Sequence, residues 1–291
     1  MTIAGGELTI GALVAEIEAR LSRSSVVEAE TEARDLVAAV AGERRFWPTV
    51  NRASPAEPHV AAAARAAAAR RALGAPFAYA VGVAAFRHLT LEVDERVLIP
   101  RQETEELVDA VLARAHPQGS VADIGTGSGA IALALATEGD FARVVATDVS
   151  RDALAVAQRN RRRVESDLRC QVQLRCGALL APLEGERFDV IVSNPPYIAY
   201  EEAADLPDSV RDWEPPIGLF SAGSGMAATT ALIRQAPEVL APGGLLALEV
   251  DARRASLAAE AALATRAYRD VSIRLDMAGR ERIFLATRED G

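Results

Sequence analysis

Lysine is absent from this 291-residue chain, and all 32 of its basic side chains are arginine. The protein therefore has no lysine amine for Schiff-base catalysis and no P-loop lysine for holding nucleoside triphosphates. Cysteine is also scarce, since only Cys170 and Cys176 occur. Their spacing, without a histidine cluster nearby, does not match that of zinc ligands. We expect two reduced thiols and no metal site.

Long hydrophobic runs and an excess of positive charge are also missing. No apolar stretch reaches the roughly 20 residues that a transmembrane helix requires. No basic segment precedes an apolar core at the N-terminus, so we expect no signal peptide, no membrane association and a cytoplasmic location. The net charge of −9 disfavours broad binding to nucleic acids. We therefore expect no direct nucleic-acid partner.

The pattern of hydrophobic residues changes along the chain and predicts three parts. Residues 1–75 are expected to be helical, because apolar residues in "TIGALVAEIEARL" recur at helical spacing and "PHVAAAARAAAARRAL" has high helix propensity. Short alternating runs in residues 76–97 predict a β-hairpin linker. Residues 98–291 alternate strand and helix, which predicts an α/β fold with a mostly parallel, doubly wound sheet. The last two strands have no helix between them and should form an antiparallel hairpin at the sheet edge.

A glycine-rich turn follows the first predicted strand of this sheet and precedes its helix. The turn consists of Gly125, Thr126, Gly127, Ser128 and Gly129. Glycines lack a Cβ, so such a loop can bend sharply and press its N–H groups against a ligand at a helix N-terminus. Taken alone, this pattern also fits a tight structural turn or a dinucleotide-binding fold.

Asp148 ends the next predicted strand, about 20 residues beyond the glycines, where a carboxylate can accept hydrogen bonds from both ribose hydroxyls. Ser150 is the better candidate for the N-cap of the following helix, which leaves Asp148 free for a ligand. Together the turn and this carboxylate predict a site for an adenosyl ligand. Their spacing does not separate NAD from S-adenosylmethionine.

The stretch "VIVSNPPYIAY" ends a buried strand with an amide, two prolines and a phenol. The side-chain oxygen of Asn194 and the backbone carbonyl of Pro195 can accept the two N–H bonds of an incoming –NH2 group. Pro195 and Pro196 make the loop rigid, and Tyr197 can pack on the planar group. The position, at the carboxyl end of a strand, is where open α/β sheets bind ligands. We predict that these four residues form the catalytic site.

With these motifs the chain resembles the PrmC/HemK family of protein-(glutamine-N5) methyltransferases, which modify peptide chain release factors. The resemblance covers almost the whole chain and is carried by "GAPFAYAVGVAAF", "VLIPRQETEELVD", "DIGTGSGAIALALA", "NPPYI", "RDWEP" and "DMAGRERIFLA". It implies the class I fold of S-adenosylmethionine-dependent methyltransferases, a Rossmann-like, mostly parallel seven-stranded sheet. It also implies a small N-terminal helical domain, residues 1–75, that docks the release factor.

The resemblance further assigns roles to the predicted site residues. Residues 125–129 would line the methionine part of S-adenosylmethionine, and Asp148 would hold its ribose. Residues 194–197 would grip the glutamine amide of the Gly-Gly-Gln loop, with Asn194 beside the cofactor. Residues 98–103 would form a flap near the cofactor, or merely the domain junction.

The chain departs from the family after the third strand of the sheet, where Gly177 and Ala178 replace the usual acidic and aromatic residues. A lost hydrogen bond and lost aromatic packing are each worth about 1 kcal/mol. We expect somewhat weaker cofactor binding, with the backbone N–H of Ala178 still able to reach the adenine ring.

The sequence leaves three alternatives open. The Asn-Pro-Pro-Tyr motif also occurs in adenine-N6 methyltransferases of nucleic acids, although the acidic charge argues against them. A ribosomal protein could provide the methylated glutamine. The chain could also be a catalytically inactive module that only binds S-adenosylmethionine, which Gly177 and Ala178 leave possible.

Overall fold

The computed structural model describes residues 7–24 and 26–290, which fall into two compact units. One unit comprises Met1–Val83 together with Pro207–Trp213, and the other comprises Ala84–Leu206 and Glu214–Gly291. The boundary near Val83 lies inside the predicted linker. The short internal segment of the first unit carries no signal in the sequence that would place it there.

The first unit is helical, as predicted. Its helices are α1 (Ile10–Leu21), α2 (Ala29–Ala41), α3 (Trp47–Val50), α4 (Pro58–Ala72), α5 (Phe77–Val81) and α9 (Asp208–Arg211). Thr9 caps α1 by accepting a hydrogen bond from the N–H of Ala12, and Gly42 ends α2 in the left-handed conformation. One face of α4 packs small side chains, such as the fully buried Ala64 and Ala68, against α1 and α2.

Residues 77–81 correct part of the linker prediction, because they form helix α5 rather than a strand. Pro76 precedes the helix with φ suited to a helix start, and Gly82 ends it with φ of 81°. A short apolar run such as this fits either a strand or one buried helical turn, and periodicity does not decide between them. The hairpin itself is shorter than predicted and consists of β1 (Val83–Phe86) and β2 (Leu89–Glu92).

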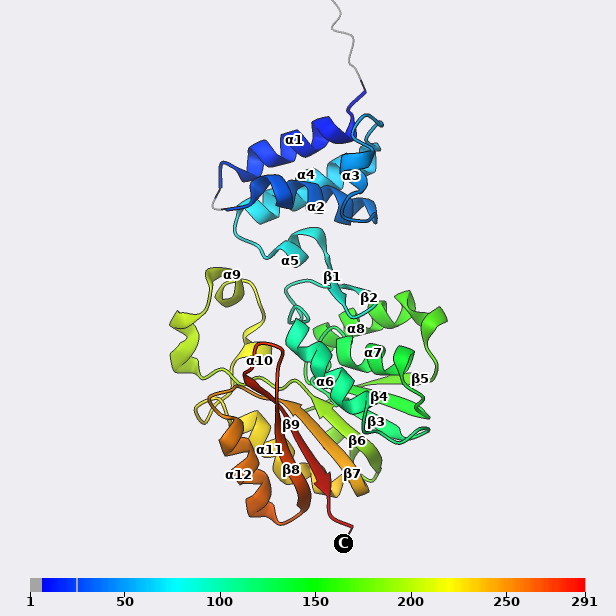
Figure 1. Cartoon of the computed structure of the whole chain (residues 1–291), viewed down its shortest axis with the longest axis vertical. Helices are drawn as coiled ribbons and strands as arrows, with labels where there is room; N and C mark the ends of the chain where they lie inside the picture. The colour runs from blue at the N-terminus through cyan, green and yellow to red at the C-terminus, as the bar shows by residue number, and fades with distance from the viewer. Residues whose placement is uncertain (1–6, 25, 291) are drawn as a thin grey trace, which may run out of the picture. The chain divides into compact units, whose positions relative to one another are not determined.

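The second unit contains a seven-stranded sheet in the order β5-β4-β3-β6-β7-β9-β8 (Figure 1). The strands are β3 (Ser120–Ile124), β4 (Arg143–Asp148), β5 (Gln171–Cys176), β6 (Phe188–Ser193), β7 (Leu240–Glu249), β8 (Tyr268–Leu275) and β9 (Glu281–Arg288). The first five run parallel, and β9 pairs antiparallel with both β7 and β8. The predicted mostly parallel sheet with an antiparallel hairpin at its edge is confirmed.

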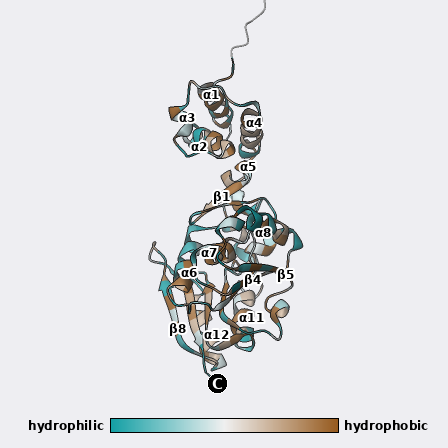
Figure 2. Cartoon of the chain, turned by 90° about the vertical axis from the view of Figure 1, so that its right-hand side faces the viewer, coloured by the Kyte–Doolittle hydropathy of each residue, from teal (hydrophilic) through white to brown (hydrophobic). Residues whose placement is uncertain are grey.

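Helices cover both faces of this sheet, as a doubly wound fold requires. Helices α6 (Gln102–Leu112), α7 (Ala130–Glu138) and α8 (Arg151–Arg163) lie on one face, and α11 (Ala227–Gln235) and α12 (Ala255–Thr265) on the other. Almost every residue of α7 is buried. Helix α8 instead shows the colour of hydrophilic residues in Figure 2. Because the first five strands are parallel, their carboxyl ends lie at the same side of the sheet, where open α/β folds bind ligands.

Short elements complete the second unit. They are α10 (Pro216–Leu219) and the 3₁₀ helices Glu165–Asp167, Ala181–Leu183, Tyr200–Asp205 and Ala236–Glu238. Across the part of the chain that the structure describes, no helix combines the length and hydrophobicity needed to cross a membrane. Cys170 is half-buried and Cys176 is exposed, and neither forms a disulfide.

Candidate active site

One cavity of about 270 Å³ opens at the carboxyl ends of the parallel strands and gathers most of the predicted site residues. Its lining includes Gly125, Thr126, Gly127, Ser128, Asp148, Ala178, Asn194, Pro195 and Pro196. Gly129 and Tyr197 do not line it. The whole lining comes from the second unit.

The glycine-rich turn contains glycines of two kinds. Gly125 and Gly127 have φ of 72° and 55° and line the cavity, and a Cβ added to either would meet no heavy atom within 4 Å. Their bare backbone thus opens toward a ligand. Gly129 differs, because a Cβ there would lie 3.2 Å from the Leu133 side chain and 3.4 Å from that of Ala157. Gly129 therefore serves close packing between α7 and α8.

Asp123 stabilises this turn through hydrogen bonds, a role that the sequence reasoning missed. Its fully buried Oδ2 accepts hydrogen bonds from the Thr126 hydroxyl at 2.6 Å and the Ala132 N–H at 3.1 Å. Burial raises the pKa of Asp123 to about 7, against the effect of these two donors. A carboxyl residue inside a predicted buried strand, two residues before a glycine turn, is the sequence signal that could have identified it.

Asp148 is not free, which corrects the expectation that its carboxylate is reserved for a ligand. Its Oδ2 accepts from the N–H of Gly127 at 2.9 Å, and its Oδ1 accepts from the N–H of Ser150 at 2.8 Å. Ser150 is nevertheless the N-cap of α8, as predicted, through a bond from the Ala153 N–H. Because each carboxylate oxygen has a second lone pair, Asp148 can still accept hydrogen bonds from a ribose.

The local structure explains why a glycine, Gly177, follows β5. A Cβ on Gly177 would lie 2.4 Å from Cγ of Pro182, so no other residue fits there unless the proline ring moves. Ala178 follows and lines the cavity. The acidic side chain that the resemblance leads one to expect at residue 177 is therefore incompatible with the path of the chain at Pro182.

The Asn-Pro-Pro-Tyr loop leaves the end of β6, and both of its polar side chains are held by hydrogen bonds. Nδ2 of Asn194 donates to Thr104 Oγ1 at 3.1 Å, and the Tyr197 hydroxyl donates to Glu249 Oε1 at 3.1 Å. The guanidinium of Arg282 lies 6.0 Å from the centre of the Tyr197 ring. Thr104 and Glu249 are further residues that the sequence reasoning did not identify.

The segment that precedes α6 is attached to a buried carboxylate. Glu214 accepts hydrogen bonds from the Ile99 N–H at 3.2 Å and from the Arg101 guanidinium at 2.5 Å. Leu98, Pro100 and Arg101 line the cavity. This geometry brings the predicted flap beside the glycine-rich turn.

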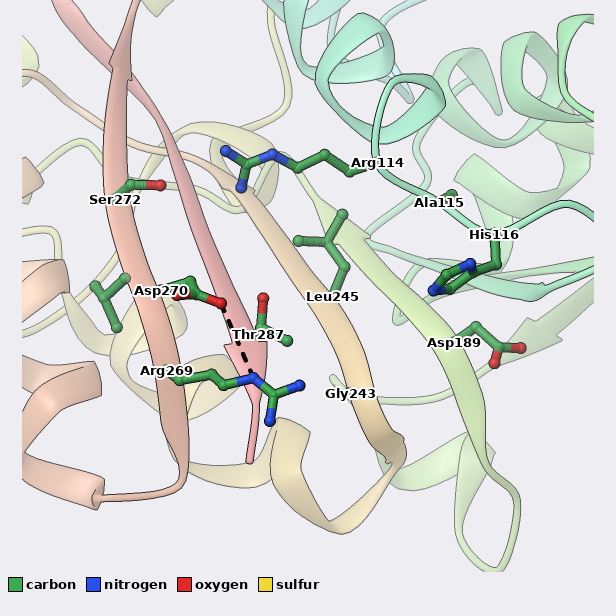
Figure 3. Close-up of a pocket in the computed structure, with 11 residues that line it drawn as sticks. Arg114, Ala115, His116, Asp189, Gly243, Leu245, Arg269, Asp270, Ser272 and Thr287 are labelled. Atoms are coloured by element: carbon green, nitrogen blue, oxygen red, sulfur yellow. Dashed lines mark ion pairs between the residues drawn. The ribbon is translucent and has the colours of Figure 1, made fainter. Parts of the chain in front are cut away.

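A second, larger cavity of about 660 Å³ lies at the opposite end of the sheet, near the start of β6 and of β8 (Figure 3). Two of its charged side chains, Arg269 and Asp189, have polar partners. Arg269 pairs with Asp270 and Asp290, and Asp189 accepts from both the N–H and the hydroxyl of Ser120. Within residues 7–24 and 26–290, no three metal-ligating side chains gather in any place.

Comparison with known proteins gives consistent matches along the chain. Residues 12–82 match the PrmC N-terminal domain, and residues 102–206 match the methyltransferase small domain. A release factor glutamine methyltransferase from Moorella thermoacetica is 46% identical over 76% of this chain and 78% of its own length. Another protein of that name, from Cereibacter sphaeroides, is 39% identical over 92% of this chain and 94% of its own. A solved methyltransferase structure from Pyrococcus furiosus aligns with a TM-score of 0.53 at 19% identity, over 70% of this chain and 91% of that one.

Proposed function

Because the chain belongs to the family of release factor glutamine methyltransferases, we propose that it methylates peptide chain release factors. The methyl group would pass from S-adenosyl-L-methionine to the side-chain amide nitrogen (N5) of the glutamine in their Gly-Gly-Gln loop. One observation carries this proposal. Residues 125–128 of the glycine-rich turn, Asp148 and Asn194 line the same cavity, which supports placing the cofactor beside the amide-binding loop.

The residues present fit S-adenosylmethionine. The bare backbone at Gly125 and Gly127 would hold the methionine part, Asp148 the ribose, and the N–H of Ala178 the adenine. The bound sulfonium compound supplies an electrophilic methyl group. The buried side chains of Ile131 and Leu232 contribute apolar surface to the cavity, next to which the sulfonium compound would bind.

The Asn-Pro-Pro-Tyr loop would orient the glutamine amide. The Oδ1 of Asn194 and the carbonyl of Pro195 each accept one N–H of the substrate –NH2 group. An amide nitrogen is a weak nucleophile because its lone pair is delocalised into its carbonyl. Two acceptors that fix both hydrogens oppose this delocalisation and aim the lone pair at the methyl group. The reaction needs no general base before transfer, since the nitrogen releases its proton after the new bond has formed.

We propose that the first unit docks the release factor, which the match to the PrmC N-terminal domain supports. Residues 98–103 would close beside the cofactor as a flap, in keeping with their place in the cavity wall. The enzyme would act in the cytoplasm, where translation terminates.

The test is a methylation assay with purified protein, labelled S-adenosylmethionine and a recombinant release factor, with the modified peptide identified by mass spectrometry. We expect one methyl group on the glutamine of the Gly-Gly-Gln loop. Asn194→Ala should reduce turnover by at least about 100-fold, because it removes one of two fixed acceptors, while cofactor affinity by calorimetry stays within about threefold.

Other results would redirect the assignment. Methylation of naked DNA or RNA, with none of the release factor, would favour a nucleic-acid methyltransferase. Methylation of a ribosomal protein alone would change the substrate. Cofactor binding without transfer to any of these would favour a binding module, and full turnover by Asn194→Ala would contradict the role of that residue.

A further inference from the structure

A buried carboxylate lies beneath the Asn-Pro-Pro-Tyr loop and contacts two hydroxyl groups. Glu249 ends β7 and is 1% exposed. Its Oε2 accepts a hydrogen bond from Thr104 Oγ1 at 2.6 Å, and its Oε1 accepts one from the Tyr197 hydroxyl at 3.1 Å. Thr104 belongs to α6 and is 4% exposed. These bonds connect residues that are far apart in the sequence.

The direction of each hydrogen bond follows from the chemistry of the groups. Ionised Glu249 can only accept, so the single hydroxyl proton of Thr104 points at Glu249. Oγ1 of Thr104 therefore has only lone pairs left for Asn194, 3.1 Å away. Only the NH2 end of the Asn194 amide can donate to those lone pairs. The oxygen end must then point away from Thr104.

Other charges near Glu249 bear on its ionisation. Burial raises the pKa of Glu249, whereas the Thr104 hydroxyl, the positive charge of Arg282 and the Tyr197 hydroxyl lower it, and Glu103 raises it. Burial also raises the pKa of Tyr197, so the phenol keeps its proton and donates. Arg282 itself lies 3.6 Å from the carboxylate of Asp276. Both hydroxyls donate to Glu249 in the structure, and donated hydrogen bonds favour the ionised form of a carboxyl group.

We propose that Thr104 and Glu249 are positioning residues that fix which end of the Asn194 amide faces the substrate. With the carboxylate and hydroxyl in place, Asn194 presents its oxygen, the acceptor that a substrate –NH2 group needs. Without them the Asn194 amide can rotate by 180° and present its own NH2 group to the substrate. Two hydrogen-bond donors would then face each other, and no hydrogen bond would form. The same carboxylate holds Tyr197, so one buried group orients both ends of the loop. This inference rests on the proposed amide-methylating function.

Two substitutions at Thr104 separate the hydroxyl from the side-chain volume. Thr104→Val keeps the branched shape but removes the hydroxyl, and Thr104→Ser keeps the hydroxyl. We expect Thr104→Val to lower kcat for release-factor methylation by about 10- to 100-fold, with cofactor affinity unchanged, and Thr104→Ser to stay within about threefold of the unsubstituted enzyme. Glu249→Gln leaves one acceptor for two hydroxyls and should lower kcat in the same way.

Thr137→Val is the matched control for loss of a buried threonine hydroxyl. Thr137 lies in α7 and does not line the cavity. Its hydroxyl lies within hydrogen-bond distance of the Leu133 and Ala134 carbonyls and of Nε2 of His88. The substitution should cost stability without lowering kcat. Equal kcat in Thr104→Val and the unsubstituted enzyme, or an equal loss in Thr104→Ser and Thr104→Val, would overturn the inference.

A second readout does not depend on turnover. The side-chain amide of Asn194 gives a pair of proton–nitrogen NMR signals, identified by their absence in Asn194→Ala. We expect this pair to shift and to exchange faster with solvent in Thr104→Val but not in Thr104→Ser. Unchanged signals in Thr104→Val would overturn the inference. An unsubstituted enzyme that fails to methylate the release factor would refute the proposed function, while these signals still decide the positioning role.

Discussion

Asp123 combines a structural role at the glycine-rich turn with an unfavourable burial of charge. Its Oδ2 is satisfied by Thr126 and Ala132, whereas its Oδ1 has no hydrogen-bond partner in the described part of the chain. Burial of an ionised carboxyl group costs free energy that the protonated group avoids. The result is a pKa of about 7 in the folded protein, well above the value of about 3.9 expected in an unfolded chain.

A pH dependence of stability follows from this shift. Between pH 4 and 7 the folded protein holds a proton on Asp123 that the unfolded chain has lost, so stability falls as pH rises through this range. The contribution is fully present below pH 4 and absent above pH 7. Asp123→Asn should flatten this part of the curve by up to about 4 kcal/mol. Urea unfolding of both proteins from pH 4 to 8 measures the effect, and parallel curves would contradict it.

Individual site residues were predictable from the sequence where their role depends on neighbours along the chain. The glycines at 125 and 127 and the amide at 194 stand in short motifs, and the structure brings them to one cavity. Thr104 and Glu249 could not be predicted, because their hydrogen bond joins residues separated by 145 positions. Neither residue type is unusual in a helix or strand. Only the packing of α6 against β7 reveals the pair.

The loop between β5 and the 3₁₀ helix Ala181–Leu183 shows how an element constrains the proposed cofactor site. Gly177 is required by the ring of Pro182, so Gly177→Ala should destabilise the fold by about 1–3 kcal/mol through overpacking. Pro182→Ala removes the Cγ and Cδ atoms that a Cβ at residue 177 would meet. We therefore expect Gly177→Ala to have much less effect in the Pro182→Ala background.

A double-mutant cycle from urea unfolding tests this coupling directly. Additive effects of the two substitutions would show that Pro182 is not the reason for the glycine. Ala178→Gly, at the neighbouring residue of the cavity wall, is the control and should show no coupling to Pro182→Ala. Cofactor affinity measured on the same proteins reports whether the loop has moved.

Elements whose order along the chain carries information were predictable, and an isolated short run was not. The alternation of strands and helices in the second unit gave the correct class of sheet, because strands separated by helices favour parallel pairing. Residues 77–81 were placed in a strand because five apolar residues cannot distinguish one helical turn from an extended run. The assignment of Pro207–Trp213 to the first unit depends on tertiary contacts alone.

The division of the molecule into two units predicts which residues each ligand protects from hydrogen exchange. All residues that line the cavity proposed for the cofactor belong to Ala84–Leu206 and Glu214–Gly291. S-adenosylmethionine at 100 times its dissociation constant adds about 2.7 kcal/mol of stability, or roughly 100-fold slower exchange for amides that exchange through unfolding. Hydrogen exchange read by mass spectrometry should show this protection in the second unit and leave α1, α2 and α4 unchanged.

The release factor should add protection where the cofactor does not. If the first unit docks this partner, addition of a release factor to the cofactor complex should slow exchange in peptides from residues 8–72. Asn194→Ala is the control, because it should keep both patterns of protection while losing turnover.

Cofactor-dependent protection of α1 would contradict the proposed confinement of the cofactor site to one unit. Equal exchange in residues 8–72 with and without the release factor, at concentrations that support methylation, would refute docking by the first unit while leaving the chemistry at Asn194 intact.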